Sequence, residues 1–160
     1  MSSRRGALHL SDYIKSHLNA ELRQRGVIVN REVEIRSGII DPGEKTDIHV
    51  DAISRNAKSN TFDRVSVIIE VKGCWNDEVE TAMQTQLVQR YLRENQCKCG
   101  IYVVGWYLCD AWTHDYRKNR THKMSLEQAR LLYNAQALSL SNDGLDIRAF
   151  VLNTALSIVS

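Results

Sequence analysis

The sequence predicts an α/β protein with a central mixed β-sheet flanked by helices. Three segments carry apolar residues at helical spacing and five carry them at strand spacing, in the order α-β-β-β-α-β-α-β. Short connections between consecutive strands favour antiparallel pairing, whereas a helix that joins two strands of one sheet makes them parallel. This order therefore predicts a mixed sheet.

Length and composition are those of one globular domain, which we place over residues 1–160. Of these residues 43% are hydrophobic and 25% are charged, and the formal net charge of +2 is too small to indicate nucleic-acid binding by itself. No apolar run reaches the roughly 18 residues that a membrane span needs. The N-terminus lacks the apolar core of a signal peptide. We therefore expect a cytoplasmic protein without membrane contact.

The first part of the chain predicts a helix and two strands. Residues 10–25 form the helix, because leucine and isoleucine recur every four residues before Gly26 ends it. Strands follow at 27–37 and 46–55, and the turn DPGEK sets the start of the second. With the next strand, at 65–75, they predict an antiparallel meander packed on the helix.

The strand at 65–75, with the sequence VSVIIEVKGCW, carries two unexpected charges. Its valines and Ile69 fall on one face, and Ile68, Glu70 and Lys72 fall on the other. A carboxylate and an ammonium on such an apolar strand are costly to bury unless each has a partner. The pair is therefore either a structural ion pair or the floor of an active site.

The second half predicts two helices and two strands. A helix at 76–94 leads to a strand at 97–109, which we expect to be central and parallel to the strand at 65–75. A capping box of Ser125 and Gln128 opens a helix that runs to about residue 140. The last strand is predicted at 146–152.

The strand at 46–55 brings acidic side chains toward this pair. If it pairs with the strand at 65–75, Asp47 approaches Glu70 and Lys72, and Asp51, on the same face, is its rival as a metal ligand. We prefer Asp47 because it lies nearest the turn, where a site can open. His49 is interpreted as a structural histidine rather than a group that supports the ligands.

An Asp on one strand followed by Glu-x-Lys on the next resembles the signature of the PD-(D/E)XK, or restriction-endonuclease-like, nuclease superfamily. The order of elements is also that of the restriction-endonuclease-like core. The resemblance implies a metal-dependent deoxyribonuclease that hydrolyses DNA phosphodiester bonds, a Mg²⁺-dependent endonuclease such as the effector of a bacterial defence or repair system.

The same resemblance assigns roles to particular residues. Asp47, Glu70 and the carbonyl of Val71 would hold Mg²⁺, with Mn²⁺ as a substitute, because hard ions take oxygen ligands. Lys72 would orient or deprotonate the attacking water and stabilise charge in the transition state. The resemblance also offers three accessory candidates, Glu21, Gln84 and Gln86, although we favour the interpretation that they are exposed helix residues.

The densest positive run lies in the segment DAWTHDYRKNRTHK, before the last helix. If the nuclease interpretation holds, this run would contact DNA phosphates, and otherwise it is a solvated loop. The candidate contact residues are Arg117, Lys118, Arg120 and Lys123.

The four cysteines are expected to be reduced. Three of them, including Cys97 and Cys99, lie in strand-like stretches, where cysteine behaves as a small apolar residue. A zinc site at Cys97-x-Cys99 is less favoured, because no second ligand pair is evident.

Other functions stay open. A catalytically inactive nuclease-fold module would bind nucleic acid or a partner protein, but it would be expected to lack Asp47, Glu70 or Lys72, and all three are present. A Holliday-junction resolvase-like homodimer would share the core. An α/β interaction domain with a coincidental motif would bind neither Mg²⁺ nor Mn²⁺. The implied partners are DNA and either a second copy of the chain or a larger defence protein.

Overall fold

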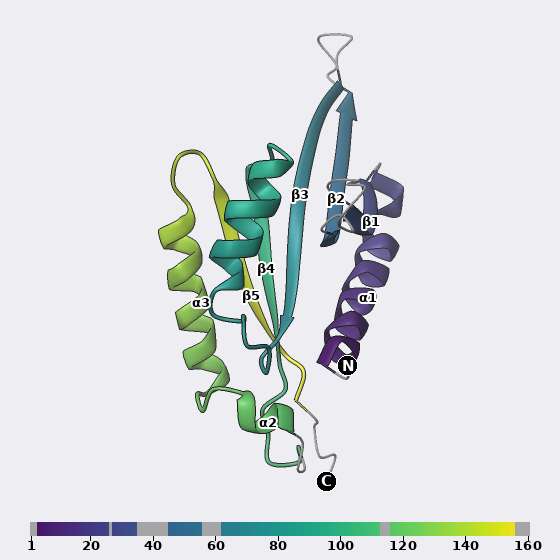
Figure 1. The fold of residues 1–160 in the computed structure, drawn as a ribbon. Helices are drawn as coiled ribbons and strands as arrows, with labels where there is room; N and C mark the ends of the chain where they lie inside the picture. Colours follow the sequence, from purple (N-terminus) through teal and green to yellow (C-terminus); the bar gives the residue numbers. More distant parts are fainter. Residues whose placement is uncertain (1–2, 26, 35–44, 56–61, 113–115, 156–160) are drawn as a thin grey trace, which may run out of the picture.

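The five strands form one mixed sheet in the order β1-β2-β3-β4-β5 (Figure 1). The computed structural model describes residues 3–25, 27–34, 45–55, 62–112 and 116–155. Pairing is antiparallel between β1 and β2 and between β2 and β3, and parallel between β3 and β4 and between β4 and β5. The elements are α1 (Ser3–Leu22), η1 (Arg23–Arg25), β1 (Val27–Glu34), β2 (Lys45–Arg55), β3 (Phe62–Gly73), η2 (Met83–Leu92), β4 (Cys99–Trp106), α2 (Tyr116–Arg120), α3 (Leu126–Leu140) and β5 (Asp146–Asn153).

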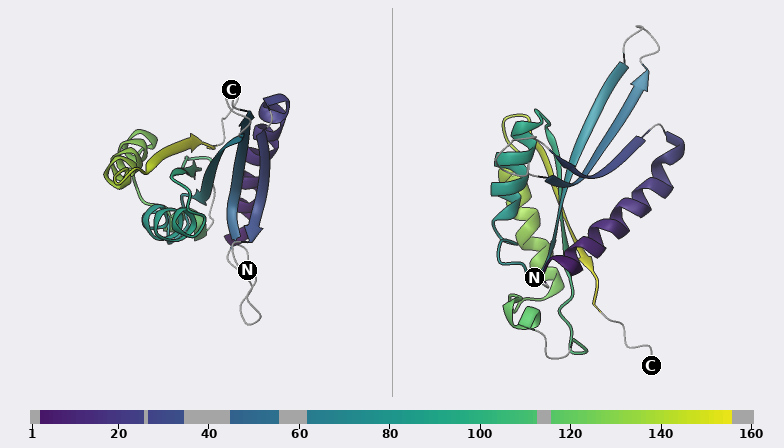
Figure 2. Two further views of the ribbon diagram at one scale, coloured as in Figure 1. Left: turned by 90° about the horizontal axis from the view of Figure 1, so that it is seen from above. Right: turned by 45° about the vertical axis from the view of Figure 1, so that its right-hand side comes forward.

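This architecture confirms the α/β class, the antiparallel meander and the parallel pairing of β3 with β4. Helices cover the two faces of the sheet separately, as Figure 2 shows. On one face, Leu10 of α1 packs with Ile69 and Val103. On the other, η2 and α3 bury a larger core around Ile68 and Tyr102. The sheet is therefore the middle of three layers.

The predicted alternation along β3 is confirmed. Ile69 and Val71 belong to the core beneath α1, whereas Ile68 belongs to the core beneath η2 and α3. Because side chains alternate along a strand, Glu70 and Lys72 share the face of Ile68 and lie under η2, the unlabelled teal helix beside β3 in Figure 1. The two charges are thus on the same buried face.

Several predicted boundaries are wrong. The helix expected from residue 10 begins at Ser3, and the helix expected from residue 76 begins near Met83. Between residue 76 and Met83 the chain forms a turn, in which the Asn76 side chain accepts a hydrogen bond from the Glu78 backbone N–H. Helix η2 is also wider than an α-helix, with π-type hydrogen bonding. The short helix α2 was not expected at all.

The helix α3 begins as the capping box predicts. The Ser125 side chain accepts from the Gln128 N–H, and the Gln128 side chain accepts from the Ser125 N–H. None of the helices in the described residues is long and apolar enough to span a membrane.

Side chains at the two ends of α3 reach the outer edge of β5. The hydroxyl of Ser141 accepts from the Ile147 N–H at 3.0 Å and donates to the Ile147 carbonyl at 3.2 Å. Arg130 donates to the Val151 carbonyl at 3.4 Å. Backbone groups at both ends of this edge are therefore bonded within the chain.

Candidate active site

Glu70 and Lys72 form a buried ion pair on β3. Lys72 Nζ lies 2.7 Å from Glu70 Oε1, and the side chains of Lys72 and Glu70 are only 13% and 3% exposed. Removing two charges from water costs several kcal/mol per ion, which attraction offsets only when the remaining polar atoms are also bonded. Lys72 has one further bond of this kind.

Gln86 of η2 provides the second partner of Lys72. Lys72 Nζ donates to Gln86 Oε1 at 2.7 Å, and Gln86 Nε2 donates to Glu78 Oε2 at 2.8 Å. Four side chains, Glu70, Lys72, Gln86 and Glu78, therefore form one polar chain that joins β3 to η2 and to the turn before it. Gln84, two residues from Gln86, is exposed.

Tyr102 of β4 holds the backbone turn that contains Glu78 against the sheet. It is the register partner of Glu70 in the parallel pair, and it is fully buried. Its hydroxyl donates to the carbonyl of Val79 at 2.7 Å, next to Glu78. Because a buried hydroxyl without a partner is costly, this bond helps fix the turn over β3 and β4.

The two candidate aspartates of β2 occupy different places. The backbone of Asp47 belongs to β2, but its side chain lies outside the described residues, so its approach to Glu70 stays a prediction. The described pairing of β2 with β3 ends at Ile48 and Ile69, the neighbours of Asp47 and Glu70. Asp51 faces Ser66 instead, four residues before Glu70. At the rise of a strand this separation is roughly 13 Å.

Asp51 belongs to a separate polar cluster. It accepts hydrogen bonds from Arg64 and Ser66, and His49 Nε2 lies 3.5 Å from its Oδ1. Partial burial acts to raise the pKa of Asp51, but the Ser66 hydroxyl and the Arg64 guanidinium outweigh it, so the pKa lies below its ordinary value. Asp51 and Arg64 thus form a structural ion pair, in which Arg64 balances the charge of the carboxylate.

Sequence reasoning did not identify this cluster. Its members come from two strands, and only the register that pairs Asp51 with Ser66 brings them together. Arg64 lies two residues from Ser66 on the same face of β3. The cluster could therefore have been predicted from the sequence only with the correct register of the β2–β3 hairpin.

The structure does not bring Glu21 to Glu70. Glu21 is exposed, and its helix α1 packs on the face of the sheet opposite the polar chain. Of the three accessory candidates, only Gln86 contacts the pair.

The basic run lies beside the turn that follows β3. Arg120 forms an ion pair with Asp77, and Arg117 lies over the ring of Trp75 at 5.3 Å. Lys118 donates to the carbonyl of Trp112, and Lys123 is exposed. The run is therefore at the end of β3 that carries Lys72.

Two of the cysteines have structural contacts. The Cys97 thiol donates to the carbonyl of Ser66 at 2.9 Å, and the Cys74 thiol lies 3.6 Å from the Thr121 hydroxyl. Burial raises the pKa of both thiols, which keeps them protonated and weakly nucleophilic. All four cysteines are free.

The side-chain atoms that contact Lys72 Nζ are oxygen atoms, and as metal ligands they suit Mg²⁺ better than zinc. Glu70 supplies a carboxylate and Gln86 an amide oxygen, and both lie within 2.7 Å of Lys72 Nζ. Over the part of the chain that the structure describes, no three His, Cys, Asp or Glu side chains lie close enough to hold a metal.

Comparison of the chain with protein-family models, with curated proteins and with solved structures finds no match.

Proposed function

We propose that the chain is a Mg²⁺-dependent deoxyribonuclease with a restriction-endonuclease-like core. The observation that carries the proposal is the ion pair of Glu70 and Lys72, buried on one face of a central strand and tied to Gln86. The order of pairing supports it, because an antiparallel hairpin leads into parallel strands and β2 carries Asp47 next to the last described pair. Asp51 is a poor alternative ligand, because Arg64 and Ser66 already occupy its oxygens.

Lys72 would act on the water that attacks the phosphorus. Its ammonium is held by Glu70 and Gln86 at 2.7 Å each, so its position is set before a substrate arrives. In a site with so little exposure, a fixed positive charge stabilises developing negative charge far more than it would in water. As an ammonium Lys72 would orient the water, and only after losing a proton of its own would it receive one from the water.

Glu70, Asp47 and the carbonyl of Val71 would hold the metal. A bound Mg²⁺ would neutralise charge on the scissile phosphate. The carboxylate of Glu70 then serves two groups, because it also contacts Lys72. Its contact with Lys72 places the ammonium near any ligand that Glu70 binds.

The basic run would place DNA at this end of the sheet. Lys123 is exposed, and Arg117 lies on Trp75, two residues after Gly73 at the end of β3. Lys118 and Arg120 are bonded within the protein, so we expect them to contribute less to phosphate binding.

Plasmid nicking tests the proposal. Purified protein is incubated with supercoiled plasmid and Mg²⁺ or Mn²⁺, beside Lys72→Ala and Glu70→Ala. Metal-dependent nicking by the wild type that both substitutions abolish would support the proposal. Equal nicking by all three proteins would overturn the site, because contamination or another centre would then be responsible.

A catalytically inactive module that binds nucleic acid or a partner protein is the second candidate. One observation favours it: both Glu70 and Gln86 already engage Lys72, as in a purely structural ion pair. No nicking by any variant, with a melting temperature that metal leaves unchanged, would select this candidate. A metal-induced rise in melting temperature without nicking would keep the metal site and indicate a missing substrate or activating partner.

A further inference from the structure

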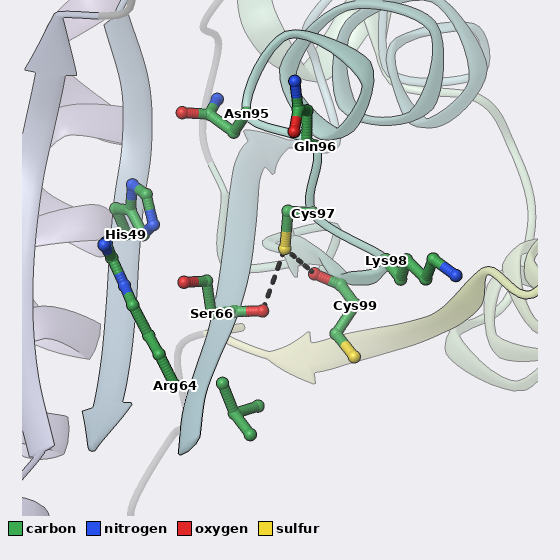
Figure 3. Close-up of a pocket in the computed structure, with 9 residues that line it drawn as sticks. His49, Arg64, Ser66, Asn95, Gln96, Cys97, Lys98 and Cys99 are labelled. Carbon is green, nitrogen blue, oxygen red and sulfur yellow. Dashed lines mark hydrogen bonds between the residues drawn. The ribbon is translucent and has the colours of Figure 1, made fainter. Parts of the chain in front are cut away.

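A pocket lies on the same face of the sheet as Glu70 and Lys72, at the C-terminal end of η2. Its volume is about 630 Å³, within the usual range for ligand pockets. Figure 3 shows His49 and Arg64 on one side, and Asn95, Gln96 and Cys97 on the other. The pocket thus joins β2 and β3 to the segment between η2 and β4.

A cation on its wall favours an anion. Among the described residues that line the pocket are Arg64 and no carboxylate; Lys98 also lines it, but its ammonium points away from Arg64, toward Gly144. The carboxylate of Asp51 contacts three of the lining residues, and its oxygens accept hydrogen bonds from two of them, Arg64 and Ser66. The same bonds fix the position of the Arg64 guanidinium, while 62% of the Arg64 side chain stays exposed. A pre-positioned guanidinium loses little entropy when it binds a phosphate.

A buried imidazole adds a second, independent observation. His49 is 8% exposed, and its Nε2 has no hydrogen-bond partner in the part of the chain that the structure describes, although Asp51 Oδ1 lies 3.5 Å away. A buried polar nitrogen without a hydrogen bond is uncommon in a folded protein. A ligand oxygen in the pocket would supply that bond.

We propose that this pocket holds a backbone phosphate of the substrate strand, away from the bond that is cut. The inference rests on the proposed function, because it takes Glu70 and Lys72 as the cutting site. Ser66 precedes Glu70 by four residues on the same face of β3, a separation of roughly 13 Å. One strand of B-DNA carries a phosphate about every 3.4 Å of helix axis, so the pocket lies about four phosphates from the cut.

The sheet carries a matched control for the test. Asp51→Asn with Arg64→Gln removes the ion pair of the pocket without changing the net charge, and Asp146→Asn with Arg148→Gln removes an exposed pair on β5. Lys98→Gln removes the charge of another lining residue, whose ammonium points away from Arg64. Binding of a fluorescent 20-base-pair DNA is measured by anisotropy in EDTA, which prevents metal-dependent cutting, across a series of salt concentrations.

We expect the pocket variants to lose about three- to tenfold in affinity, the loss of one charge-assisted contact, and the β5 variant to bind as the wild type does. The slope of log affinity against log salt should fall by about 0.9 for each phosphate contact removed. An unchanged far-ultraviolet circular dichroism spectrum and a cooperative urea transition confirm folding. Equal losses in the pocket and β5 variants, or none in either, would overturn the inference.

Nicking by the same proteins separates the two proposals. If the wild type nicks plasmid and the pocket variants bind DNA normally, the pocket is rejected and the nuclease remains. If the wild type does not nick but the pocket variants alone lose affinity, the nuclease is rejected and the pocket remains a nucleic-acid site. A wild type that binds no DNA would overturn both.

Discussion

Two ion pairs with the same sequence spacing lie in very different parts of the sheet. Glu70 and Lys72 are two residues apart on β3, and Asp146 and Arg148 are two residues apart on β5. The contacts are 2.7 and 2.8 Å long. The side chains of the first pair are 3% and 13% exposed, and those of the second 58% and 69%.

An acid-x-base motif therefore indicates a functional site only when both of its side chains are buried. An exposed pair contributes little to stability and is common on sheet surfaces. A buried pair costs desolvation energy that apolar residues of the same size would avoid, so its presence calls for another reason. Catalysis is the reason that we propose.

Replacing the buried pair should give the largest effect. Lys72→Met leaves the Glu70 carboxylate buried without its cation, and we expect the free energy of unfolding to fall by roughly 3 kcal/mol. Adding Glu70→Leu should restore stability to within about 1 kcal/mol of the wild type, because two apolar side chains then replace two ions. Urea unfolding measures both values.

Activity should not return with stability. The double variant should nick plasmid at least about 100-fold more slowly than the wild type, since general acid–base and charge effects of this size are typical. A stable double variant with full nicking activity would show that the pair serves neither function nor stability.

Gln86 and Gln84, two of the three glutamines of η2, should differ in their effect on the nicking rate. Gln86→Ala removes the bond to Lys72 and should slow nicking by about tenfold, because the ammonium loses one of its two positioning contacts. Gln84→Ala, on an exposed side chain of the same helix, should leave the nicking rate unchanged. Similar losses in both variants would indicate damage to the helix rather than to the site.

The pair of Asp51 and Arg64 should show an intermediate, pH-dependent effect. The folded pKa of Asp51 lies below the ordinary value of 3.8. The stabilisation is therefore complete well above pH 3.8 and disappears as the pH falls through the lower folded pKa. We expect Asp51→Asn to be less stable than the wild type at pH 7 and equally stable below that pKa, by urea unfolding. A difference that persists in strong acid would contradict this assignment.

The exposed pair on β5 should give the smallest effect. Asp146→Asn with Arg148→Gln should leave the urea midpoint and the nicking rate unchanged, since solvent screens both charges. A lower midpoint or rate in this variant would remove the contrast between the two pairs.

Much of the fold follows from local patterns. The alternation of Ile68 and Ile69 predicted both faces of β3, and the box of Ser125 and Gln128 predicted the start of α3. The start of α1 at Ser3 did not follow, because residues 3–9 carry no apolar stripe and an established helix extends by one hydrogen bond per residue. Five residues of α2 are too few to form a periodic pattern.

The candidate site was predicted only in part, because it depends on contacts between distant segments. Glu70 and Lys72 could be paired from strand geometry alone. Which glutamine reaches Lys72 depends on how the wide helix η2 lies on the sheet, and the pocket beside His49 depends on the register of β2 with β3. Neither arrangement has a local sequence signal.

The bonds from α3 to the outer edge of β5 bear on how this protein behaves when it is concentrated. An exposed strand edge is a template on which another molecule can add a strand and begin a polymer. Here the hydroxyl of Ser141 and the guanidinium of Arg130 occupy backbone groups of Ile147 and Val151 that an incoming strand would need. Growth of the sheet by strand addition at β5 is therefore opposed, because an incoming strand would have to displace these bonds.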